Sequence, residues 1–166
     1  MAIRNIVCDG DPILLKQTRK VEKFDAKLHE LLQDMADTLK EQNGAGLAAP
    51  QIGLMRQVCI VLADEEEGII ELINPEITHS EGEQDGIEGC LSFPNEFGLV
   101  KRPMIVTVRA QDRDGNWFEK TGEGFTARAF CHEIDHLQGI LFKTKVSRML
   151  TQEELDNGEY AEEEEV

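Results

Sequence analysis

The five residues 132–136, which read HEIDH, constrain this chain more than any other stretch. If the segment is helical, His132 and His136 lie one turn apart and project from the same face. Two imidazoles placed in this way can hold one metal ion, and Glu133 beside them can handle a proton of metal-bound water. The flanking residues are good helix formers, and Gly139 stands where a left-handed C-terminal cap would fall. The pattern therefore predicts a metal-binding helix within residues 127–139.

This helix should be buried, because apolar residues cover more than one of its sides. One face carries the two histidines, and a neighbouring face is wholly apolar. The residues are Phe125, Ala129, His132 and His136 on the first face, and Phe130, Ile134 and Leu137 on the second. Histidines on a buried face need an explanation, so metal ligation competes with one alternative, two core histidines spaced by four by chance.

An amphipathic helix is predicted earlier in the chain. Asp25 is a suitable N-cap, and Asn43 followed by Gly44 is a typical stop. Between them runs an apolar stripe made of Leu28, Leu31, Leu32, Met35 and Leu39. This spacing predicts a surface helix that packs its leucines on a sheet.

Strand signals fill the middle of the chain. Residues 57–62 and 69–75 are strand-like on either side of an acidic turn, and residues 104–111 alternate between apolar and polar. Asp114 and Gly115 form a turn signal before residues 117–120, and residues 140–142 are expected to add a short strand. The fold class predicted is α+β, with antiparallel β-sheets packed around the buried helix that carries HEIDH and the amphipathic N-terminal helix outside.

The length of 166 residues fits one domain with a real core. We expect residues 1–150 to form a single catalytic metallohydrolase domain and residues 151–166 to be an acidic, weakly ordered tail. No apolar run is long enough to span a membrane. The four cysteines form no CxxC pair and no signal peptide begins the chain, so the expected location is the cytoplasm.

The charge balance excludes some partners. The formal net charge is −16, from 33 acidic and 17 basic residues. A polyanion would be repelled over most of such a surface, so direct binding of nucleic acid is not expected.

A catalytic metal site needs a third protein ligand and an open position for water. One metalloprotease pattern has a glycine three residues after the second histidine, as Gly139 is here, but requires a third histidine three residues later, where this chain has Phe142. Another pattern uses a carboxylate about twenty residues downstream, which here means Glu153, Glu154 or Asp156. Those residues lie in a tail without an apolar face that could anchor it. A domain with a structural zinc would need four ligands, and only three are convincing.

The remaining source of a third ligand is a thiolate. Cys131 is adjacent to His132 and so points about 100° round the helix from it, which makes joint ligation awkward. Cys90 lies in the stretch EGCLSFP and fits an exposed loop better than the interior of a strand. From the residues alone, Cys90 remains either a ligand or a small buried hydrophobe.

Three stretches together resemble one family, the peptide deformylases. They are residues 44–51, GAGLAAPQ, residues 88–92, EGCLS, and residues 132–136, HEIDH. They occur in the family's order and at compatible separations, and the likeness extends from about residue 3 to residue 142. The resemblance implies that Cys90, His132 and His136 hold one divalent metal ion.

The family removes the formyl group from the N-formylmethionine of nascent polypeptides and releases formate. The resemblance implies that metal-bound water attacks the formyl carbon with Glu133 as general base. It also implies that the Gln51 side-chain amide and the Leu91 backbone N–H stabilise the oxyanion. The Gly46 backbone would bind the substrate's peptide chain in an extended pose.

The methionine side chain needs an apolar pocket, for which the candidates are Ile87, Phe125, Ala129 and Cys131. Glu88, Arg102 and Asp135 are either partners that orient the ligands or ordinary surface ion pairs.

The metal and the partners follow from the resemblance. A thiolate with two imidazoles suits Zn²⁺ by intrinsic affinity, whereas the family implies Fe²⁺, with Zn²⁺, Ni²⁺ or Co²⁺ as substitutes. The expected partners are N-formylmethionyl peptides and nascent chains, with transient ribosome contact. The acidic tail argues against tight docking on the ribosome through this segment.

Overall fold

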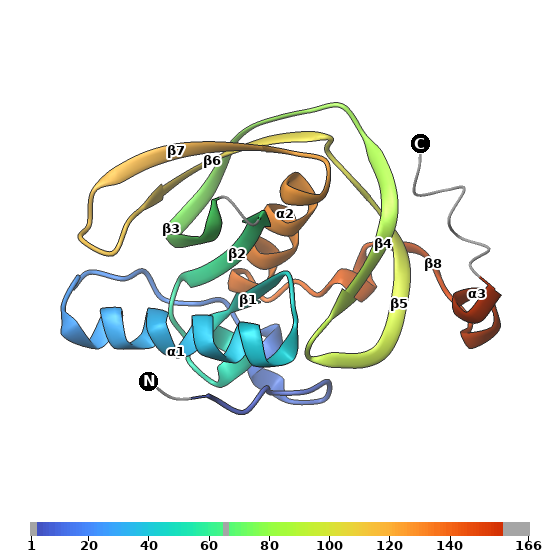
Figure 1. Cartoon of the computed structure of the whole chain (residues 1–166), viewed down its shortest axis with the longest axis horizontal. Coiled ribbons are helices and arrows are strands. Elements are labelled where there is room, and N and C mark those ends of the chain that lie inside the picture. The colour runs from blue at the N-terminus through green and yellow to red at the C-terminus, as the bar shows by residue number, and fades with distance from the viewer. Residues whose placement is uncertain (1–2, 65–66, 158–166) are drawn as a thin grey trace.

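Two antiparallel sheets and two main helices make up the fold (Figure 1). One sheet has five strands in the order β1-β2-β3-β6-β7, and the other has three in the order β4-β5-β8. The structure is a computed structural model, and it describes residues 3–64 and 67–157. The predicted α+β class with antiparallel sheets is confirmed.

The elements have the following bounds. The strands are β1 (Gly46–Ala48), β2 (Val58–Asp64), β3 (Gly68–Glu81), β4 (Gln84–Cys90), β5 (Phe93–Arg102), β6 (Ile105–Gln111), β7 (Trp117–Glu123) and β8 (Val146–Met149). The helices are α1 (Ala26–Gln42), α2 (Phe125–Leu137) and α3 (Gln152–Asn157), and the 3-10 turns are η1 (Pro12–Leu15), η2 (Ala49–Ile52) and η3 (Phe142–Thr144).

Helix α1 begins and ends where the sequence indicates. The Asp25 side chain accepts a hydrogen bond from the Leu28 N–H, which satisfies one of the free donors of the first turn. Asn43 ends the helix in a left-handed conformation with φ 53°. The predicted leucine stripe is buried, so the amphipathic helix is confirmed.

Strand β2 is sandwiched between two helices, which explains its unbroken apolar sequence. Val58 and Ile60 pack in the cluster that includes the α1 leucines, whereas Cys59 and Val61 pack in the cluster that includes α2. Alternate side chains of one strand therefore enter two different cores. The five-stranded sheet forms the middle layer, with α1 on one face and α2 on the other (Figure 1).

Helix α2 lies in the interior between the two sheets (Figure 1). Its residues are buried from Ala127 to Ile134. Gly139 follows its C-terminal end with φ 75°, and a Cβ there would lie 2.6 Å from the Leu15 carbonyl oxygen. Glycine at this position therefore permits both the left-handed turn and the close passage of another segment.

The β4–β5 hairpin departs from the expectation for Cys90. We expected a loop there, but Cys90 is the last residue of β4, directly before the turn to β5. A register shift between Gly89 and Cys90 interrupts the regular pairing of β4 with β5. The end of this strand therefore lacks the alternation of apolar and polar residues by which a strand is recognised in a sequence. β4 is an end strand of its sheet and β1 is an end strand of the other.

The C-terminal region also differs from expectation. Residues 140–142 do not form a strand; the chain passes through η3, and β8 pairs with β5 instead. In the predicted tail, Gln152–Asn157 form α3, and residues 158–166 lie outside the described residues. Over the described ranges, no helix is long and apolar enough to cross a membrane.

Candidate metal centre and catalytic cleft

Three potential metal ligands converge where the end of β4 meets α2. The Sγ of Cys90 and one ring nitrogen each of His132 and His136 lie within 4.8 Å of one another. Cys90 Sγ is 3.2 Å from His136 Nε2. Cys90 therefore reaches the two histidines across 42 and 46 residues of sequence because β4 ends beside the middle of α2.

This donor set fits a single metal ion. Two ligands of one tetrahedral ion stand about 3.5 Å apart, close to the separation of Cys90 Sγ and His136 Nε2. His132 binds Glu88 through Nδ1, which leaves its Nε2 for a metal. Burial lowers the pKa of His136 well below its usual value, so this imidazole is neutral, the form that binds metals.

The other cysteines are not part of this group. Cys131, which we expected on the wall of the side-chain pocket, is instead buried in the core between α2 and the five-stranded sheet. Cys59 lies in the same cluster, and burial raises the pKa of both thiols. Cys90 is more exposed than either and lines the cavity described below.

Glu133 packs against the backbone of β1. A Cβ placed on Gly46 would lie 2.5 Å from Glu133 Oε2, so the carboxylate occupies the space that a side chain at position 46 would fill. Glu133 Oε1 is buried and has no hydrogen-bond partner among the described residues. Burial raises the pKa of Glu133 to about 7, which suits a group that takes and returns protons near neutrality.

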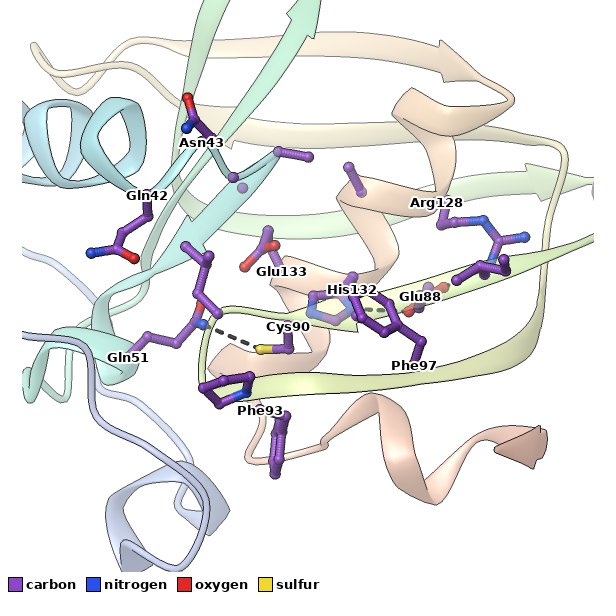
Figure 2. A pocket seen from close by; sticks show the side chains of 18 of the residues that line it. Gln42, Asn43, Gln51, Glu88, Cys90, Phe93, Phe97, Arg128, His132 and Glu133 are labelled. Carbon is purple, nitrogen blue, oxygen red and sulfur yellow. Dashed lines mark hydrogen bonds and ion pairs between the residues drawn. The ribbon is translucent and has the colours of Figure 1, made fainter. Parts of the chain in front are cut away.

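The Gln51 side chain is held in one orientation. Its Oε1 accepts a hydrogen bond from the Ala48 N–H at 2.9 Å. Its Nε2 donates to Cys90 Sγ at 3.3 Å (Figure 2). The same Nε2 also donates to Ser92 Oγ at 3.2 Å. One amide N–H therefore points at Cys90, one of the potential metal ligands, and the other at Ser92. Ser92, which sequence reasoning did not single out, orients this amide.

A buried ionic network lies behind His132. Glu88 accepts hydrogen bonds from Arg102, Arg128 and His132, and Arg102 also donates to Asp135. Burial raises the pKa of Glu88, but the hydrogen bonds from Arg102 and His132 outweigh it and bring this pKa to about 2. Glu88 and Arg102 are buried, so the alternative of surface ion pairs is wrong.

A cavity of about 430 Å³ opens beside these groups (Figure 2). Its walls come from residues 42–46, from the β4–β5 hairpin and from α2. Three expected pocket residues, Ile87, Phe125 and Ala129, line it together with Leu91, and Phe125 is 60% exposed. Arg128 also lines it, and sequence reasoning missed this residue, although its position one turn before His132 was a usable signal.

One cysteine and two histidines lie around one point, with a buried glutamate beside them and a cavity at their side. This arrangement defines a class: α+β proteins with a single-metal hydrolase type of site. The model of one family, polypeptide deformylase, matches residues 3–152. The chain belongs to the polypeptide deformylase family, and it is accordingly an enzyme.

Curated relatives and solved structures agree with this assignment. Peptide deformylase of Caldicellulosiruptor bescii is 53% identical over 156 residues, which cover 94% of this chain and 93% of that protein. Peptide deformylase 1 of Bacillus subtilis is 48% identical over 155 residues, 93% of this chain and 97% of that protein.

Among solved structures, peptide deformylase from Thermotoga maritima matches with a TM-score of 0.85 at 36% identity, over 89% of this chain and 99% of that one. A class I type b peptide deformylase from Acinetobacter baumannii, bound to Met-Ala-Ser, matches with a TM-score of 0.84 at 33% identity, over 87% of this chain and 100% of that one.

Proposed function

We propose that this enzyme hydrolyses the formyl amide at the N-terminus of formylmethionyl peptides and releases formate. The observation that carries the proposal is the meeting of Cys90, His132 and His136 beside Glu133, at the side of a cavity that can take one amino-acid side chain. Nascent polypeptides are the proposed natural substrates, with transient contact to the ribosome, in the cytoplasm. We assign the chemistry to residues 1–150.

The residues proposed to hold the metal are Cys90, His132 and His136. A divalent cation bound there polarises a carbonyl oxygen and lowers the pKa of a coordinated water. We propose Fe²⁺ as the ion in the cell, with Zn²⁺, Ni²⁺ or Co²⁺ as substitutes. The Glu88 carboxylate supports this set because its hydrogen bond to Nδ1 fixes the orientation of the His132 ring.

Glu133 is proposed to move the proton. Its carboxylate takes a proton from the attacking water and delivers it to the amine nitrogen as the formyl C–N bond breaks. The pKa of about 7 suits both directions of transfer. Gly46 supports this role, since its missing side chain leaves the carboxylate room at the cavity.

Hydrogen-bond donors must stabilise the negative charge that develops on the formyl oxygen. We propose the Gln51 side-chain N–H and the Leu91 backbone N–H for this role. Gln51 Nε2 lies next to Cys90 Sγ, and its orientation is set by Ala48 and Ser92. A preoriented amide stabilises the transition state without reorganisation during the reaction.

The peptide is proposed to bind as an extended strand. β1 and β4 are end strands of different sheets, and both contribute residues to the cavity, so an extended chain can find backbone groups on either side. Gly46 on β1 is the proposed backbone partner. Ile87, Phe125 and Ala129 are proposed to contact the methionine side chain. The Met-Ala-Ser complex of the A. baumannii relative supports peptide binding in this fold.

The test is an oxygen-free assay with formyl-Met-Ala-Ser as substrate, in which formate is measured together with the metal content of the same sample. We expect stoichiometric formate and intact Met-Ala-Ser, and we expect Cys90→Ser to lose both metal and activity. Cleavage within the peptide, or full activity and metal in the Cys90→Ser variant, would instead support a protease with a downstream carboxylate ligand.

Sensitivity to air follows from the proposed thiolate and ferrous ion. Activity of the iron form should decay in air, whereas the nickel or cobalt form should persist longer. The measurement is residual activity against time in air for each metal form, with an anaerobic sample of each as control. Equal decay of all forms would argue against iron oxidation as the cause.

A further inference from the structure

Arg128 on α2 contacts the carboxylate that orients one of the proposed metal ligands. Its Nη1 donates to Glu88 Oε2 at 2.8 Å and to the Val100 carbonyl at 2.9 Å. Glu88 Oε1 in turn accepts from His132 Nδ1 at 2.8 Å. Arg128 and His132 stand four residues apart on α2, so Glu88 of β4 bridges two side chains on one face of this helix.

Arg102, the other arginine that contacts Glu88, pairs with two carboxylates. It donates through Nε and Nη2 to Glu88 and through Nη1 to Asp135. Within the described part of the chain, Glu88 is the one carboxylate that Arg128 pairs with. Arg128 therefore pairs with Glu88 alone through Nη1, its Nη2 is buried without a hydrogen-bond partner among the described residues, and its side chain is only 5% exposed, where charge pairing is poorly screened.

Gly86 makes room for this guanidinium. A Cβ on Gly86 would lie 2.7 Å from Arg128 Nη2, 2.9 Å from Cζ and 3.1 Å from Nε, so the planar group lies flat over this residue. Gly86 precedes Glu88 by two residues on β4, so both face the same side of the strand. Gly86 also pairs with Val100, whose carbonyl accepts from Arg128.

We propose that Arg128 is a positioning residue for the metal centre: it holds the Glu88 carboxylate on His132 Nδ1 and thereby aims the other ring nitrogen of His132 at Cys90. Gly86 is required because a side chain there would displace the guanidinium. This inference rests on the proposed ligation by Cys90, His132 and His136. It adds two residues that lie outside the three sequence motifs.

The test uses the cobalt-loaded enzyme without substrate, and it follows the release of cobalt to a chelator and the visible absorption spectrum of the bound ion. Arg128→Met and Gly86→Ala should each speed release about tenfold or more, the range seen when partners of metal ligands are lost. Both should change the cobalt spectrum. Arg128→Lys keeps the charge but loses the planar guanidinium that lies over Gly86, so it should release cobalt at an intermediate rate.

Two controls separate positioning from general instability. Gly122→Ala crowds α2 from the opposite sheet, because its Cβ would lie 2.7 Å from Thr126 Cγ2 and 2.8 Å from Phe130 Cε2. This variant should lower the melting temperature and leave cobalt release unchanged. Arg109→Met removes an arginine that stacks over Trp117 outside the site, and it should change neither the spectrum nor the release rate.

Wild-type release rates and spectra in folded Gly86→Ala and Arg128→Lys would overturn the inference, even if Arg128→Met failed to fold. Failure of the wild-type enzyme to retain cobalt would overturn the metal centre and this inference together. Retention of cobalt without hydrolysis of formyl peptides would overturn only the proposed reaction, since the release assay contains no substrate.

Discussion

At the scale of single residues, the site depends on the Glu133 side chain and on the lack of a side chain at Gly46. Glu133 is buried with a pKa raised to about 7, and it has space because position 46 is a glycine. The carboxylate and the strand backbone occupy adjoining volumes, so a change at either position alters the other. Two predictions test this relation.

Replacing Glu133 by Gln should leave the metal in place and lower turnover by about 10³-fold, because the amide cannot carry the proton while the three ligands are untouched. The measurements are metal content by elemental analysis and kcat on a formyl-Met peptide. Loss of metal in parallel with activity would show that Glu133 is a ligand and that its proposed role is incorrect.

Replacing Gly46 by Ala should push the Glu133 carboxylate away from its place, since the new Cβ would meet Oε2 at 2.5 Å. We expect a loss of about 10²-fold in kcat, the size of effect that a displacement of about 1 Å can have, with metal content unchanged. Gly122→Ala serves as the matched control for a crowded glycine on a strand. Wild-type kcat in folded Gly46→Ala would contradict the steric argument.

At the scale of elements, the site is assembled where an interior helix meets the end of a strand. α2 supplies Glu133 and two of the proposed ligands, β4 supplies the third, Cys90, and β1 with η2 supplies Gly46 and Gln51. α3 contributes no residue to this cavity. It is connected to β8 by a partly exposed ion pair between Arg148 and Glu154, a type of contact that adds little stability.

Deleting the chain from Thr151 onward should therefore leave the metal bound and keep turnover of a short formyl-Met peptide within about threefold, under roughly 0.7 kcal/mol of transition-state energy. β8 and the buried Leu150 remain in this variant. Metal content and kcat/KM of the truncated and full chains are the measurements. A folded truncation without metal would revive Glu153, Glu154 and Asp156 as ligands.

At the scale of the whole molecule, the strong negative charge and the buried network give the protein a specific response to acid. The formal net charge of −16 falls in magnitude as carboxylates are protonated. Most of these groups are on the surface, whereas Glu88 is buried with its pKa lowered to about 2. A lowered pKa adds stability above the unfolded value of about 4.3, and this stability is lost as the pH falls towards 2.

The metal-free protein should accordingly lose about 3 kcal/mol of unfolding free energy from Glu88 between about pH 5 and pH 1, the equivalent of its pKa shift, with roughly half of the Glu88 carboxylates still ionised at pH 2. In Glu88→Gln this part of the pH dependence should be absent, although the variant is less stable at pH 7. Urea unfolding at several pH values measures both. Parallel pH profiles for the two proteins would show that Glu88 does not govern acid stability.

Local patterns in the sequence determined much of this molecule. Capping and periodicity located α1 between Asp25 and Asn43, and the spacing of His132 and His136 indicated two ligands on one helical face. The β2–β3 hairpin and β6 were also recognisable, because alternation and turn residues act over a few positions. The resemblance of three motifs to the peptide deformylases implied that Cys90 lies beside His132 and His136.

The tertiary structure alone decided how distant segments fit together. It placed Cys90 at the end of a strand, buried Cys131 in the core, and brought Arg128 onto Glu88 across 40 residues of sequence. It also set the Glu133 carboxylate against Gly46. The physical reason is that these contacts depend on the packing of β1, β4 and α2 against one another, and the periodicity within a single segment carries no information about which other segment it will meet.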